Sequence, residues 1–194
     1  MTDNSLRQSD VLHELELIGY SFNSLWEFRD SKLKYRDAIP LLVSALERAT
    51  DPKLTEQIVR ALTVPWAKPL ATRPLIEQFQ TVDDTTGFGL RWTIGSALDV
   101  VWDDAHYDDL IALAREASYG AARQMLVMGI GRSKKPEAVD VLIELLDDPD
   151  VSGHAVIALR KLRATKARPH LEKMLHDKRA WVRKEVQRAL TALA

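Results

Sequence analysis

The chain has 194 residues, of which 46% are hydrophobic and 28% are charged, ordinary values for a globular protein. Its net charge of −1 gives no global electrostatic reason to expect binding to nucleic acid or to a membrane surface. The chain contains no cysteine, which excludes disulfides, cysteine-based zinc fingers and cysteine nucleophiles and suits a reducing cytosol.

The N-terminal segment, residues 1–34, is expected to cap the rest of the fold. A helix is predicted over about 6–18, ended by Gly19, and a short amphipathic segment follows over 24–29. The polar start, MTDNSLRQSD, has no secretory signal pattern. No apolar run in the chain approaches the roughly 18–20 residues that span a bilayer. We therefore expect a cytoplasmic protein with no membrane span.

From residue 35 onward the chain repeats itself with a period near 30 residues. Val151 and Ala158 correspond to Val182 and Ala189, in each case 31 positions later. A fixed period of this length is typical of solenoids, in which each unit buries its apolar side against the next. We expect about five units in one continuous domain over 35–194, and we place them at about 35–66, 67–102, 104–132, 135–163 and 165–194.

Each unit is predicted to be a hairpin of two helices. In the clearest unit, Pro136 suits a first helical turn, and Val139, Leu142 and Leu146 recur at helical spacing. The turn over 147–150, DDPD, combines proline with aspartates that can cap the next helix. Strand signals are absent, so the fold class is all-α. The longer turn TVDDTTGFG is predicted to be a flexible loop.

Two stretches, LIELLDDPDVSGHAVIALRKL and KMLHDKRAWVRKEVQRALTAL, resemble HEAT repeats of the phycobilisome-lyase HEAT-like type. That signature has an Asp-containing turn, then Val-Arg, then Ala, then Ala-Leu, and residues 182–190 match it with Val186 in place of the first Ala. The resemblance is strong over 120–194, moderate over 67–119 and weak before that. It implies a right-handed α-α superhelix whose second helices line a concave face. It implies no single activity, because such arrays serve many ends.

Arg91, Arg123 and Arg183 occupy one position of the repeat, in the first turn of a second helix. One interpretation is a ladder of cations on a binding face. The interpretation we favour is that each arginine pairs with an aspartate of a neighbouring turn, as the family's arginine commonly does. A cation in the first turn of a helix opposes the helix dipole, so a partner is expected in either case.

The repeat register places a set of mostly apolar residues on the concave side of the second helices. One explanation is that a tight superhelix buries its own inner helices, with Gly129, Gly131 and Gly153 allowing close approach. The alternative is a groove for a partner helix or peptide, to which methionine side chains adapt well. The candidate partner-binding residues are Trp92, Gln124, Met125, Met128, His154, Val156, Ile157, Lys184 and Arg188.

Charge is unevenly distributed along the chain. Residues 83–116 contain eight acidic and two basic residues, whereas residues 160–188 contain eleven basic and three acidic residues. A basic end that meets a phosphate or an acidic protein is one interpretation. We favour the other, a terminal unit that is polar because it faces solvent. Trp181 is expected to pack as a hydrophobic staple at the start of the last helix.

The sequence predicts no catalytic residues, no cofactor and no metal site. The five histidines lack His-x-x-x-His spacing, and GIGRSKK over 129–135 lacks the pattern of a phosphate-binding loop. The acidic residues Asp99, Asp103 and Asp104 are explained better by helix capping and solubility than by acid–base chemistry.

The function expected from these features is that of a non-catalytic protein–protein interaction module, which binds a helix or peptide of another protein in the concave groove and is a monomer or weak dimer. One alternative is a nucleic-acid-binding protein similar to the HEAT-like enzymes that remove alkylated bases from DNA. Trp92, Asp99 and Arg123 are of the residue types that those enzymes use, but no local motif matches, so none of these roles is assigned to them. A second alternative, implied by the resemblance, is an accessory protein similar to bilin lyases, although no distinctive tetrapyrrole site is visible.

Overall fold

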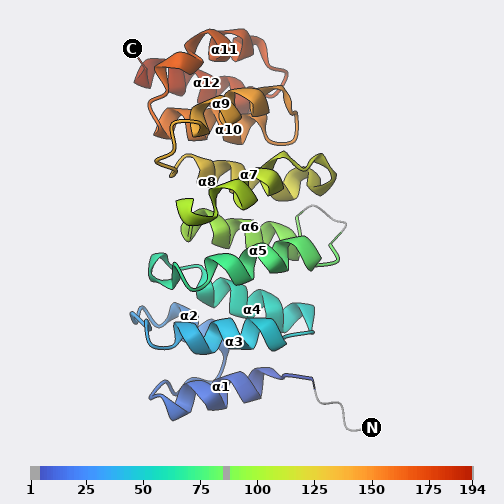
Figure 1. Cartoon of the computed structure of the whole chain (residues 1–194), viewed down its shortest axis with the longest axis vertical. Helices are drawn as coiled ribbons and strands as arrows, with labels where there is room; N and C mark the ends of the chain where they lie inside the picture. The colour runs from blue at the N-terminus through green and yellow to red at the C-terminus, as the bar shows by residue number, and fades with distance from the viewer. Residues whose placement is uncertain (1–4, 85–87, 194) are drawn as a thin grey trace.

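The computed structural model describes residues 5–84 and 88–193, which form α-helices and 3₁₀ helices and contain no β-strand. The α-helices follow one another as six consecutive pairs (Figure 1). The first helices of the pairs are α1 (Gln8–Leu17), α3 (Ile39–Arg48), α5 (Thr72–Thr81), α7 (Tyr107–Arg115), α9 (Ala138–Glu144) and α11 (Arg168–Lys173). The second helices are α2 (Leu25–Asp30), α4 (Pro52–Leu62), α6 (Leu90–Val100), α8 (Gln124–Ile130), α10 (Ser152–Lys161) and α12 (Ala180–Ala192). The 3₁₀ helices are η1 (Pro65–Ala67), η2 (Asp104–His106), η3 (Ala117–Arg123), η4 (Leu145–Asp147), η5 (Thr165–Ala167) and η6 (Met174–His176).

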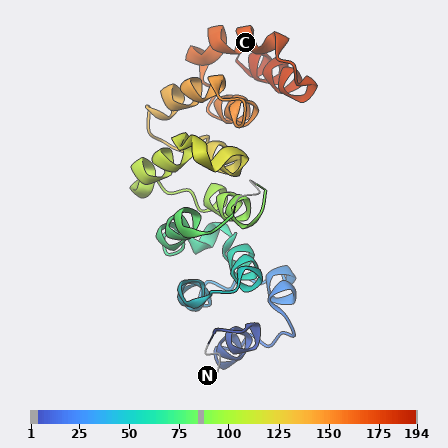
Figure 2. The same ribbon diagram turned by 90° about the vertical axis from the view of Figure 1, so that its right-hand side faces the viewer.

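The helices stack in two layers, with odd-numbered helices in the outer layer and even-numbered helices in the inner layer. Each inner helix packs against the next one, and the contacts between α6 and α8 and between α10 and α12 are the most extensive. The outer helices contact one another far less. The stack therefore bends gently, with the inner layer on the inside of the bend (Figure 2). This arrangement confirms the predicted all-α solenoid of stacked helical hairpins.

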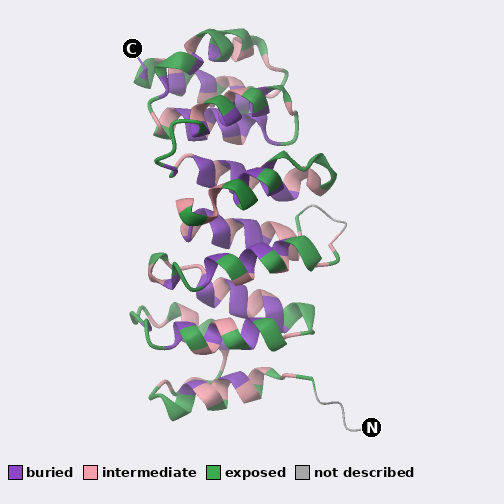
Figure 3. Cartoon of the chain, viewed as in Figure 1, coloured by how far each residue is buried: buried purple, intermediate pink, exposed green. Residues whose placement is uncertain are grey.

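Amphipathic spacing explains why each helix packs as it does. In α3 the buried side chains include Ile39, Leu42 and Leu46, which recur at the three- and four-residue intervals of one helix face. The second helix of the pair begins with Pro52, and the carboxylate of Asp51 accepts a hydrogen bond from the Leu54 amide at 2.9 Å. The buried residues of all pairs join in one core that runs along the stack (Figure 3).

The N-terminal pair, α1 and α2, continues both layers. α1 packs on α3, and α2 packs on α4. The Arg48 guanidinium donates two hydrogen bonds to the carboxylate of Glu14, at 2.9 and 2.8 Å, and this bidentate contact links α1 to α3. In the predicted loop over 81–89, α5 extends to Thr81, and residues 85–87 lie outside the described part of the chain. No helix among the described residues has the length and apolar character needed to cross a membrane.

Glycines permit the closest approaches of the inner layer. A Cβ atom at Gly129 in α8 would lie 2.6 Å from Cε3 of Trp102, and one at Gly153 in α10 would lie 2.0 Å from Cη2 of Trp181. Real Cβ atoms do not approach other carbon atoms so closely, because such distances are far inside van der Waals contact. Trp102 is buried, and its indole N–H donates a hydrogen bond to Asp104 at 2.9 Å. Packing and this hydrogen bond therefore hold the ring in place.

We predict that Gly129→Ala lowers the free energy of unfolding by about 1–3 kcal/mol, because the added methyl group overlaps the Trp102 ring. The expected sign is informative, since Gly→Ala in an unobstructed helix is stabilising. Urea denaturation followed by circular dichroism measures the change. In a Trp102→Leu background the loss should shrink, and an equally stable Gly129→Ala protein would contradict the packing described above.

Candidate functional site

The concave face is the surface of the inner layer that points away from the outer layer. It consists of the sides of the even-numbered helices that no other helix covers. Nine predicted partner-binding residues belong to four of these helices: Trp92 is on α6; Gln124, Met125 and Met128 are on α8; His154, Val156 and Ile157 are on α10; Lys184 and Arg188 are on α12. All except Val156 are at least partly exposed.

Val156 corrects the predicted set. Its side chain is 0% exposed and belongs to the hydrophobic core. Adjacent residues of an α-helix point in directions about 100° apart, so Val156 and Ile157 do not both face the groove. The partly exposed positions of α10 are His154, Ile157 and Arg160, three residues apart, and Lys161 at the end of the helix is exposed. Val156 is therefore a packing residue.

Five of the predicted residues form what we call the central strip: Trp92, Met125, Met128, His154 and Ile157. They lie on three consecutive inner helices that pack directly against one another, α6, α8 and α10. Each is only partly buried. The strip is thus mainly apolar surface in the middle of the concave face.

Trp181, at the start of α12, extends the central strip. Its ring lies over Gly153 and makes an edge-to-face contact with His154, with ring centroids 5.6 Å apart. The Arg179 guanidinium lies 6.0 Å from the indole centroid. The side chain packs across to the preceding unit and remains 45% exposed, so it also offers apolar surface that the sequence analysis did not assign to the binding face.

Several buried polar atoms near the concave face have no hydrogen-bond partner among the described residues. They are Nε1 of Trp92, Nδ1 of His154 and Nε of Arg160. Burial, with a smaller effect of the Arg179 charge, lowers the pKa of His154 and favours its neutral form. Unpaired buried donors and acceptors are costly, so a bound chain that supplied polar groups here would gain from satisfying them.

A basic hollow lies at the C-terminal end of the concave face. It has a volume of about 600 Å³ and is lined by Arg160, Lys184, Gln187, Arg188, Thr191 and Ala192. Lys184 and Arg188 therefore line a shallow, open depression. Arg188 forms an ion pair with Glu185, whereas no ion pair of Lys184 is found within the described residues.

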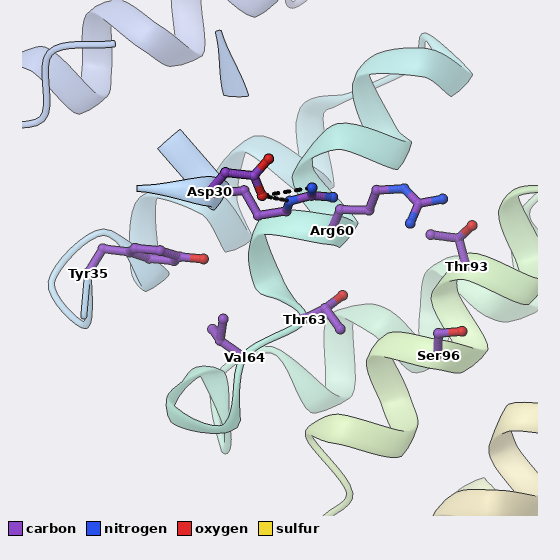
Figure 4. Close-up of a pocket in the computed structure, with 8 residues that line it drawn as sticks. Asp30, Tyr35, Arg60, Thr63, Val64, Thr93 and Ser96 are labelled. Atoms are coloured by element: carbon purple, nitrogen blue, oxygen red, sulfur yellow. Dashed lines mark hydrogen bonds and ion pairs between the residues drawn. The ribbon is translucent and has the colours of Figure 1, made fainter. Parts of the chain in front are cut away.

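A second hollow, of about 310 Å³, lies at the N-terminal end of the same face (Figure 4). Its lining residues are Arg29, Asp30, Tyr35, Arg60, Thr63, Val64, Thr93 and Ser96. Arg60 extends from α4 toward Thr93 on α6 (Figure 4). The Arg29 and Arg60 guanidinium carbons lie 4.8 and 5.7 Å from the centroid of the Trp26 ring. The sequence analysis missed this hollow, because it assigned the amphipathic segment over 24–29 a capping role only.

The arginines at the shared repeat position are structural. Arg123 is 1% exposed, and its guanidinium donates to the carbonyl of Ala114 at 3.1 Å and forms an ion pair with Asp148 of the next unit at 2.7 Å. Arg91 donates to the carbonyl of Asp84 at 2.7 Å, and Arg183 donates to that of Asp177 at 2.7 Å. Each arginine thus has a partner, and Arg123 pairs with a carboxylate of a neighbouring turn.

Ser152 replaces the arginine in the fourth unit, and Arg179 from the next turn supplies the missing guanidinium. Its Nη2 donates to Oγ of Ser152 at 2.7 Å, and Nη1 donates to the carbonyl of Pro149. The same guanidinium pairs with Asp177 at 2.9 Å. This hydrogen bond lowers the pKa of Asp177 to about 2. An arginine therefore links neighbouring units here as well. Arg123 reaches forward to the next unit, whereas Arg179 reaches back to the preceding one.

The acidic residues Asp99, Asp103 and Asp104 also have structural partners. Asp99 is paired with Arg132 at 2.8 Å, and Asp103 accepts a hydrogen bond from the Ala105 amide at 3.0 Å. Asp104 accepts from Trp102, Ser133 and the Lys134 amide. Within the described residues no group of three or more histidine, cysteine or acidic side chains is placed to hold a metal ion.

We predict that Arg123→Met lowers the free energy of unfolding by about 3 kcal/mol, because it leaves Asp148 and the Ala114 carbonyl without their charged partner. Arg183→Met should cost only about 1 kcal/mol, since Arg183 is partly exposed and donates to backbone carbonyls. Chemical denaturation of both variants tests the comparison. Equal losses would contradict the inter-unit role of Arg123.

We predict that Asp177 contributes to acid sensitivity. Its folded pKa of about 2 is below the ordinary value of 3.8, so the stabilisation is present above the ordinary pKa and is lost as the pH falls through the folded pKa. Between about pH 4 and pH 2, the free energy of unfolding should fall more steeply in the parent protein than in Asp177→Asn. Denaturation series at several pH values provide the measurement. Parallel curves would exclude the effect.

Comparison with protein-family models matches residues 107–191 to the family described as HEAT repeats. The matched segment runs from the first residue of α7 almost to the end of α12, the part of the chain in which the repeats are most regular. A comparison with curated proteins found no match. The family match shows that residues 107–191 consist of HEAT repeats, and the same architecture of stacked helical hairpins continues through the described residues that precede them.

Proposed function

We propose that the protein is a non-catalytic protein–protein interaction module whose concave face binds a helix or extended segment of another protein. HEAT repeats are commonly protein-interaction modules, and the family is generally a non-catalytic scaffold. The observation that carries the proposal is the central strip. Its methionines and Ile157 stay partly exposed on inner helices whose free sides are expected to be polar.

The surroundings of the central strip support a protein ligand. Charged hollows flank it at both ends, and an apolar centre with a polar rim is the usual arrangement of a protein interface. Two of its residues, Met125 and Met128, are unbranched and flexible, which suits a surface that adapts to a bound segment.

The charges at the two ends favour a segment with acidic flanks. Arg29 and Arg60 each have one carboxylate partner, Asp30 at 2.8 Å and Glu56 at 2.7 Å. No hydrogen bond from Nη1 of either guanidinium is found in the described part of the chain. Together with Lys184 in the opposite hollow, these groups are suited to carboxylates on either side of an apolar stretch.

The two alternative functions find no specific support in the geometry. A base-removing role for Arg123 needs an accessible guanidinium, whereas this one is buried and bonded. The bilin-lyase alternative rests on repeat positions such as Val182 and Ala189, and both are fully buried. These residues support the fold rather than pigment binding.

We predict that Met128→Asp abolishes partner capture. A carboxylate in the middle of the central strip would have to be desolvated against apolar groups, which weakens binding by at least about tenfold. Affinity capture from extracts of the source cells, quantified by mass spectrometry, measures retention of each protein by the parent chain and by the variant.

The matched control is Val43→Asp, which places the same charge at a partly exposed position of α3 in the outer layer. Specific partners should be retained by this control and lost from Met128→Asp, with both proteins equally helical by circular dichroism. If Met128→Asp keeps every protein that the control keeps, the central strip is not the binding surface.

A further inference from the structure

The outer layer contains a separate groove between α7 and α9. These helices are neighbours in the outer layer (Figures 1 and 2), but they contact each other much less than α8 and α10 do beneath them. The groove has a volume of about 640 Å³. It lies on the side of the stack opposite the central strip, so an occupant of one surface leaves the other free.

The lining of this outer groove comes from matching stripes on the two helices. On α7 the stripe includes Tyr107, Ile111 and Arg115, and on α9 it includes Val141 and Glu144. Members of each stripe are three or four residues apart, so they form a row along one helix face. Two facing rows make a channel that runs along the helices, a shape suited to a helix or an extended chain.

The floor of the outer groove is apolar, and its rim is acidic. Ile111 and Val141 lie at the bottom, each 5% exposed, whereas the carboxylates of Asp108 and Glu137 are exposed at the rim. Helix dipoles favour acidic residues in these positions near helix starts, which accounts for their sign. The dipoles do not account for the gap that lies between the helices above this apolar floor.

The carboxylates of the rim are only partly neutralised. Glu144 is paired with Arg115 across one end of the groove at 2.5 Å, and Asp140 is paired with Lys166. For Asp108 and Glu137, at the other end, no ion pair is found among the described residues. The outer groove therefore keeps two free negative charges beside its apolar floor.

Tyr107 supplies an unsatisfied polar group at the same end. Its hydroxyl oxygen is buried and has no hydrogen-bond partner in the described part of the chain. Burial raises the pKa of Tyr107, and the nearby Glu137 raises it further, so the hydroxyl keeps its proton. A neutral hydroxyl both donates and accepts, and a bound backbone or ammonium group would complete its hydrogen bonding.

We propose that the outer groove binds a second partner, a protein segment with large apolar side chains flanked by lysine or arginine. Charge complementarity identifies the occupant, because the free carboxylates favour cations and the floor accepts apolar groups. This preference is opposite to that proposed for the concave face. One chain thereby joins an acidic segment on its inside to a basic segment on its outside.

The test selects ligands from a displayed library of random peptides long enough to form several helical turns. The library is selected on the full-length protein and counter-selected on Ala112→Trp. Ala112 is an exposed member of the α7 stripe, so an indole there fills the outer groove without disturbing the core. Ser44→Trp places the same side chain at an exposed site on α3 and serves as the matched control.

Peptides that require the groove should combine lysine or arginine with a large apolar residue. They should bind the parent protein, Ser44→Trp and Met128→Asp alike, which separates them from ligands of the concave face. The double variant Asp108→Asn/Glu137→Gln, which keeps the side-chain size, should weaken them about tenfold. Added salt should weaken their binding to the parent protein, since the charges involved are exposed.

Three outcomes would overturn the proposal. In the first, no selected peptide is lost on Ala112→Trp. In the second, the peptides that need the groove are neutral or acidic. In the third, sedimentation shows self-association of the parent protein that Ala112→Trp removes, which makes a second copy of this chain the occupant.

Discussion

The structure depends on direct packing of each inner helix on the next. A single hairpin cannot bury its own apolar side, so stability arises from stacking in series. Glycines set how close that stacking is, and Gly129 brings α8 within contact distance of the Trp102 ring. Because the inner helices approach more closely than the outer ones, the stack bends (Figure 2). This difference in spacing between the two layers explains both surfaces. The residues of the central strip lie close together on the inside, and α7 and α9 lie apart on the outside.

Arginine contacts between units keep this stacking in register. A buried guanidinium is costly unless its donors are bonded, and Arg123 meets that requirement with carbonyls of its own unit and Asp148 of the next. Where Ser152 occupies the repeat position, Arg179 reaches back from the following turn. The repeat therefore conserves a contact rather than a residue. The guanidinium groups of Arg91, Arg123 and Arg183 are bonded within the protein. They therefore do not form a ladder of cations on a binding surface.

The period of the sequence was sufficient to predict hairpins and layers, because apolar spacing reports directly on what each helix must bury. The individual residues of the candidate site were harder to predict from the sequence. Val156 and Ile157 are adjacent, and only the helix rotation in the finished stack decides that Ile157 is open. Trp181 was interpreted within its own unit, whereas its ring lies over Gly153 of the preceding one. The sequence does not indicate the outer groove, because the distance between α7 and α9 depends on how the inner helices α8 and α10 pack beneath them.

Near-zero net charge conceals two surfaces of opposite sign. Basic side chains such as Arg60 and Lys184 border the concave face, and carboxylates such as Asp108 and Glu137 border the outer groove. At physiological ionic strength the field of an exposed charge fades over about 8 Å, so a layer of helices separates the two effectively. In the two interactions that we propose, each surface selects its partner by local charge. A solenoid whose inner and outer layers carry opposite charge can hold two dissimilar segments at once, and it needs no conformational change to do so.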